Sequence, residues 1–171
     1  MLKPLLKFIR AISSNTNPTA IAAAFAFGIL LGFVPKNNLL WYILTVFILF
    51  LNIQRGTYAL SIALGALLSP LLDPLFDTIG WAVLTWDKAV PAFTWLLNIP
   101  FVSFTKINNT IVQGSLIAGL ALFAPLYFLM LLIVRLWRKY LADKIRNSRI
   151  INTIKKLNLF KNLKEKLEDL E

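Results

Sequence analysis

Long apolar stretches alternate with short polar breaks along the chain. Four apolar runs are evident, at 18–34, 39–53, 57–72 and 111–134. At a helical rise of about 1.5 Å per residue, the first three extend only about 22–26 Å and the fourth about 36 Å. A bilayer core about 30 Å thick needs about 20 helical residues. The pattern therefore predicts one full-length membrane span and three marginal ones.

The number of crossings depends on where the two termini lie. Three basic residues occur among the first ten and eleven between Arg135 and Lys166, which places both termini in the cytoplasm by the positive-inside rule. The number of crossings is then even. Four crossings satisfy this, and so does a re-entrant hairpin of the first two runs followed by two spans. The hairpin would put Lys36 at mid-membrane at a cost of about 2.5–3.5 kcal/mol, unless a water-filled cavity hosts it.

The pattern thus favours four crossings in an all-α, polytopic helical membrane protein with some short or re-entrant helices. Residues 1–15 read as an interfacial amphipathic helix, because leucine and isoleucine share one helical face with lysine and arginine off it. Residues 16–135 form the predicted membrane domain. Residues 136–171 form a basic amphipathic cytoplasmic tail, which lies on lipid or docks a cytoplasmic or self partner.

Aromatic and basic residues mark the expected contacts with lipid headgroups. Residues 73–110 are rich in Trp and Phe, so they are predicted to form helices lying on the outer leaflet, or a lid over the bundle. Just after the last apolar run, the expected contacts to anionic headgroups are Arg135, Arg138 and Lys139.

Composition narrows the function classes. Of 171 residues, 58% are hydrophobic and 15% charged, the formal net charge is +10, and there is no Cys or His. Cysteine nucleophiles, imidazole bases and Cys or His metal sites are thereby excluded, and no phosphate-binding or nucleophile motif occurs. We expect no catalytic residue, no metal site and no cofactor. The basic ends are explained by topology, so a nucleic-acid partner is not expected.

Small residues recur every fourth position in two of the apolar runs. This spacing lets helix backbones approach closely. It predicts packing of the first run against the third, with self-association or docking of a partner's membrane helix as alternatives. The two stripes are Ala20, Ala24, Gly28 and Gly32, and Thr57, Ser61, Gly65 and Ser69.

Three ionisable residues lie within or beside the apolar body: Arg55, Asp73 and Asp77. Such groups are candidates for function by default. For Arg55 the favoured role is that of a boundary residue snorkelling to the interface. Asp73 is expected to cap a new helix that begins at Pro74, although the two carboxylates are also candidates for cation binding. A third run that bends or re-enters would let Arg55 approach Asp73.

Two segments carry a resemblance to a known family. Residues 17–35, NPTAIAAAFAFGILLGFVP, and 69–80, SPLLDPLFDTIG, resemble two signatures of the bacterial membrane family known as domain of unknown function 2062. Ser69 stands where that family often has Asn, and Lys36-Asn37-Asn38 replaces its Gly-containing turn. The resemblance implies a membrane-embedded subunit or anchor for a longer envelope protein, with a role in moving lipid between membranes.

These observations predict a non-catalytic subunit of the bacterial inner membrane that docks or anchors a larger envelope partner, with lipid transfer across the envelope as one context. The alternative is a small transporter or channel built on short, proline-broken helices, with Arg55 and Asp73 near its site. A lipid-modifying enzyme is a further alternative, but it would need a cluster of polar residues that the sequence does not assemble. The expected partners are anionic membrane lipid and either a larger envelope protein or a second copy of the chain.

Overall fold

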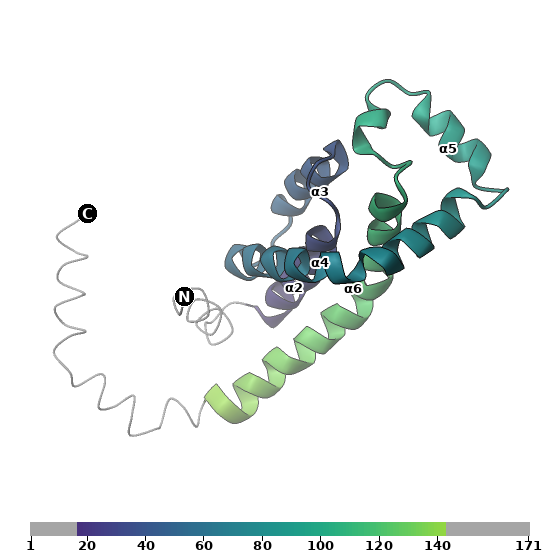
Figure 1. Ribbon diagram of the computed structural model, residues 1–171. Helices are drawn as coiled ribbons and strands as arrows, with labels where there is room; N and C mark the ends of the chain where they lie inside the picture. The colour runs from purple at the N-terminus through teal and green to yellow at the C-terminus, as the bar shows by residue number, and fades with distance from the viewer. Residues whose placement is uncertain (1–16, 143–171) are drawn as a thin grey trace. The chain divides into compact units, whose positions relative to one another are not determined.

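The computed structural model describes residues 17–142, which contain five α-helices and no strand (Figure 1). The all-α class is therefore confirmed for this part of the chain. The chain divides into two compact units, residues 1–134 and 135–171. The predicted helix at 1–15 and the tail beyond residue 142 lie outside the described residues. The elements are α2 (Pro18–Phe33), α3 (Leu39–Leu49), α4 (Arg55–Leu84), α5 (Val90–Leu97), the 3-10 helix η1 (Val102–Thr105), α6 (Thr110–Leu136) and the π-helix η2 (Trp137–Ala142).

Helix α2 forms the core of the first unit. It begins where the sequence predicts, because the Asn17 side chain accepts a hydrogen bond from the Thr19 amide at 3.1 Å and Pro18 occupies the first turn. Its side chains are apolar on every side, and a helix of this kind needs cover on every side. The segment from Gly28 to Val34 is accordingly buried without a break.

Helices α2 and α3 form a hairpin whose turn is held by Asn38. Asn38 Oδ1 accepts a hydrogen bond from the Trp41 amide at 2.8 Å, and its Nδ2 donates to the Pro35 carbonyl oxygen at 2.6 Å. The Trp41 indole then donates to the Leu31 carbonyl oxygen at 3.1 Å. That bond satisfies one of the last carbonyls of α2, which have no partner within their own helix. The turn is thus tied to the end of α2 by side chains of α3.

Helix α4 is longer than the third apolar run. The expectations that this run ends at residue 72 and that Asp73 caps a helix beginning at Pro74 are wrong. Pro70 and Pro74 lie inside one helix of 30 residues. Proline breaks backbone hydrogen bonds in a helix interior, but here Phe76 packs against Phe33 of α2 with ring centroids 5.2 Å apart. Tertiary packing thus keeps the segment helical, and Figure 1 shows α4 changing direction along its course.

The chain between α4 and α6 is mostly exposed. Helix α5 has eight residues and none of them is buried. Residues 73–84, predicted to lie on the outer leaflet together with this segment, instead belong to α4. Phe101 and Lys106, on either side of η1, adopt left-handed backbone conformations with φ of 71° and 53°. Element η1 packs against α3, so this segment returns to the α2–α3 hairpin.

Helix α6 passes close to α4 and α2 in turn. A Cβ added to Gly80 of α4 would lie 1.8 Å from the Thr110 carbonyl oxygen at the start of α6. Further along α6, Gly119 abuts Leu30 of α2, and Phe123 packs against Phe27 with ring centroids 4.6 Å apart. Because later residues of α6 contact earlier residues of α2, the two helices are antiparallel.

Candidate functional site

The two small-residue stripes meet each other inside the chain. A Cβ on Gly28 would lie 2.4 Å from Ser61 Cβ, and one on Gly32 would lie 2.7 Å from Gly65 Cα. Backbones approach this closely only where side chains are minimal. All eight stripe residues are buried or half-buried. The structure therefore uses these stripes to pack α2 on α4, and this face is not open to a partner's helix.

The α2–α3 hairpin reaches about halfway along α4. The backbone amide of Gln54 donates to the Ala20 carbonyl oxygen at 3.3 Å, so α2 and α4 begin at the same level. At the other end of α2, Ser69 Oγ lies 3.1 Å from the Phe33 carbonyl oxygen. Ser69 is about 21 Å along the helix axis from Arg55. Later residues of α2 contact later residues of α4, so the two helices are parallel. Helix α2 ends beside the middle of α4.

The structure separates the predicted polar residues. Arg55 is exposed at the start of the continuous helix α4, about 27 Å along the axis from Asp73, so the two are not brought together. Asp73 is half-buried, with Oδ1 3.2 Å from Ser69 Oγ. Asp77 is exposed and accepts a hydrogen bond from the Thr110 hydroxyl. Among the described residues no three His, Cys, Asp or Glu gather in a group able to hold a metal ion.

A shallow pocket of 650 Å³ lies where the turn of the hairpin meets η1. We call it the tip pocket. It is lined on one side by Asn37, Asn38, Leu39 and Tyr42 and on the other by Phe101, Ser103, Phe104 and Lys106. Its polar groups are amides, hydroxyls and one ammonium, and its lining contains no carboxylate. Sequence reasoning missed this pocket because its two sides lie about sixty positions apart in the chain and share no periodic pattern.

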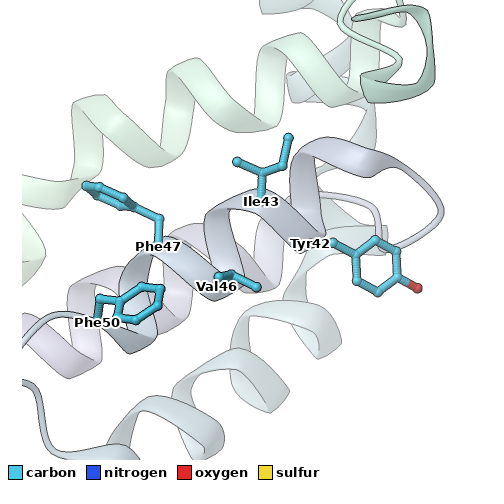
Figure 2. A pocket seen from close by; sticks show the side chains of 5 residues that line it. All are labelled: Tyr42, Ile43, Val46, Phe47 and Phe50. Carbon is cyan, nitrogen blue, oxygen red and sulfur yellow. The ribbon is translucent and has the colours of Figure 1, made fainter. Parts of the chain in front are cut away.

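A wholly apolar depression of 430 Å³ continues along the exposed face of α3. We call it the α3 groove. It is lined by Tyr42, Ile43, Val46, Phe47 and Phe50, each of them more than half exposed. In Figure 2 the Tyr42 hydroxyl points away from Val46 and Phe50, at one end of the row. Tyr42 lines both the groove and the tip pocket, so the two are contiguous.

The predicted headgroup contacts lie in the second unit. Arg135 and Lys139 are exposed, and Arg138 is half-buried. The Lys139 ammonium lies 5.2 Å from the centre of the Tyr140 ring, within cation–π range.

Two helices are long and apolar enough to cross a membrane, Arg55–Leu84 and Thr110–Tyr140. Only 17% and 28% of their most apolar windows are buried inside the protein. A core helix of a soluble protein would be mostly buried. The described residues therefore define an all-α protein with two helices suited to membrane association.

The chain belongs to the same family as a protein of Treponema pallidum (strain Nichols) described as "Uncharacterized protein". The two are 32% identical over 161 residues, which is 94% of this chain and 99% of the Treponema protein. No model of a known protein family matches the chain. No solved structure matches it either.

Proposed function

We propose that the chain is an integral protein of the bacterial inner membrane, acting as a non-catalytic subunit that docks a larger envelope partner in lipid transfer. In this proposal α4 and α6 span the bilayer and both termini are cytoplasmic. The α2–α3 hairpin enters from the cytoplasmic side. We further propose that residues 17–35 and 69–80 correspond to the two signatures of the domain of unknown function 2062 family, a family of bacterial membrane proteins.

Helix lengths favour the re-entrant hairpin over four crossings. Helix α3 has 11 residues and extends only about 16 Å, roughly half of a bilayer core. Helix α2 has 16 residues and ends beside the middle of α4. A hairpin end at this depth needs its backbone groups bonded inside the protein. Asn38, Trp41 and Ser69 supply such bonds to the end of α2 and the turn.

The observation that carries the docking proposal is the exposed aromatic segment 81–97, at the end of α4 remote from Arg55. It includes α5, which buries no residue, and the exposed Trp81, Trp86 and Trp95. In the proposed topology this segment faces the periplasm, where a larger envelope protein has access to it. Tryptophan is enriched at protein interfaces and at the headgroup level of membranes.

Site-specific photocrosslinking in native membranes tests this docking. A benzophenone amino acid in place of Trp95 is expected to yield one adduct heavier than two copies of the 19.4 kDa chain. The matched control is Leu67, which is 75% exposed on α4 within the proposed span and should crosslink to lipid alone. Absence of a protein adduct at Trp95, or the same adducts at both positions, would refute the docking proposal.

A small transporter is the second candidate. Two segments that do not span, the hairpin turn and η1, meet from opposite ends of α4 at the tip pocket. In many transporters the binding site forms where broken or re-entrant segments meet near the membrane midplane. For this candidate the ionisable residue that lines the pocket is Lys106. Asp73 bonds to Ser69 of its own helix, and Arg55 lies about 27 Å along α4 from Asp73.

Cysteine accessibility tests the re-entrant topology, because the native chain has no Cys. With a membrane-impermeant maleimide, Lys88→Cys is expected to label from the periplasm and Arg55→Cys only from the cytoplasm. Asn37→Cys, in the hairpin turn, should label at least tenfold more slowly than Lys88→Cys. Labelling of Asn37→Cys from the periplasm as fast as Lys88→Cys would contradict the re-entrant hairpin and restore four crossings.

A further inference from the structure

We infer that the tip pocket and the α3 groove together form a seat for one anionic phospholipid. The negatively charged phosphate lies against Lys106 and an acyl chain lies along α3. This inference rests on the proposed membrane topology and adds a ligand class to it.

Charge complementarity selects an anion at the tip pocket. Lys106 is exposed there, and within the described residues no carboxylate pairs with it. Ser103 and Asn37 add a hydroxyl and an amide as neutral hydrogen-bond donors on the two sides of the same pocket. A phosphate oxygen is well matched to an ammonium together with neutral donors, because charge-assisted hydrogen bonds are the stronger kind.

The apolar groove selects an amphiphile over a free anion. The side chains that line the groove are apolar apart from the Tyr42 hydroxyl, and Tyr42 also lines the tip pocket. From Tyr42 to Phe50 the groove runs about 12 Å along the helix axis. A ligand that satisfies both parts has an anionic head and a hydrocarbon chain, and the most abundant such molecule around a membrane protein is a lipid.

The direction of α3 sets the direction of the bound acyl chain. Helix α3 runs from the hairpin turn back toward the level at which α4 begins, since Gln54, just before α4, bonds to Ala20 near the start of α2. A lipid with its head at the turn therefore directs its chain toward the cytoplasm. The phosphate then lies at the depth of the hairpin turn, beside the middle of α4.

Binding of defined lipids to the full chain tests the inference. Native mass spectrometry in neutral detergent is expected to show one phosphatidylglycerol held about tenfold more tightly than diacylglycerol, which has the same acyl chains without the phosphate. One charge-assisted contact supplies about this ratio. Lys106→Gln should abolish this preference, and Lys106→Arg should retain it. The control Lys88→Gln removes an exposed charge outside the pocket and should change nothing.

A second pair of variants examines the groove. Val46→Trp, which fills the groove, should weaken both lipids at least fivefold. Leu67→Trp, on an exposed face of α4, should leave them unchanged. Three results would overturn the inference. The first is equal retention of the two lipids, and the second is an equal effect of Lys106→Gln and Lys88→Gln on lipid binding. The third is competition by glycerol phosphate that is as strong as competition by the lipid. Alkaline carbonate extraction separates the two proposals, because a chain released by it would refute the membrane topology itself.

Discussion

Replacing Gly114 with alanine is expected to lower the free energy of unfolding by about 3 kcal/mol or more, the upper part of the range for overpacked sites. The added Cβ would lie 1.7 Å from the Phe76 carbonyl oxygen and 2.9 Å from the Gly80 amide nitrogen. Both neighbours are backbone atoms of α4, so no side-chain rotation relieves the clash and the helices must separate. Thermal unfolding in detergent should show a midpoint roughly 6–12 °C lower.

Gly56→Ala is the matched control for this change. The nearest atom to a Cβ on Gly56 is Gln54 Nε2 at 3.2 Å, the end of a flexible side chain. Because alanine restricts the unfolded chain more than glycine does, this variant should unfold at the native midpoint or slightly above it. If Gly114→Ala unfolded together with Gly56→Ala, α4 and α6 would not approach as closely as described.

Replacing Gly32 with isoleucine is expected to detach α2 from α4. Its Cβ alone would lie 2.7 Å from Gly65 Cα and 2.7 Å from the Ile62 carbonyl oxygen, and the branched side chain extends further. Separation of these backbones exposes the α2 surface that the stripes cover. We expect a loss of more than about 3 kcal/mol, again measured as the unfolding midpoint in detergent.

Ala63→Ile makes the same kind of enlargement on the exposed face of α4 and should leave the midpoint within about 2 °C of the native value. The pair distinguishes packing inside the chain from general effects of a larger side chain. A midpoint for Gly32→Ile equal to that of Ala63→Ile would show that the stripes do not pack against each other.

Local pattern was sufficient to predict, to within a residue, where α2 begins and ends and where α3 and α6 begin. Asn17 and Asn38 cap α2 and α3 because an amide oxygen at these positions meets a free backbone N–H, a rule that needs only neighbouring residues. The same local reasoning failed at Pro74. Proline is favoured in the first turn of a helix. Here, however, Phe76 and Gly80 pack against α2 and α6, and this packing keeps Pro74 in the interior of α4. No local signal reports such packing.

The candidate site shows a similar division. The spacing of Gly28 and Gly32 indicated a close helix contact, and packing of the first run against the third was the favoured prediction. The tip pocket was not foreseen, because Asn37 and Lys106 belong to polar breaks that only the return of η1 to α3 brings together. The α3 groove could not be predicted from the sequence for a different reason. A helix that is apolar on every side has no periodicity from which its exposed face can be predicted.

By itself, the sequence determined the helical class, the starts of α2, α3 and α6 and the four-residue stripes, since each depends on neighbours within one or two turns. It also determined the charge asymmetry between the ends and the apolar body. Only the tertiary structure decided that α4 continues through two prolines, that α2 ends halfway along it, and that Arg55 lies far from Asp73. These features depend on packing between segments distant in the chain, where contact with another helix outweighs the local preference of a residue.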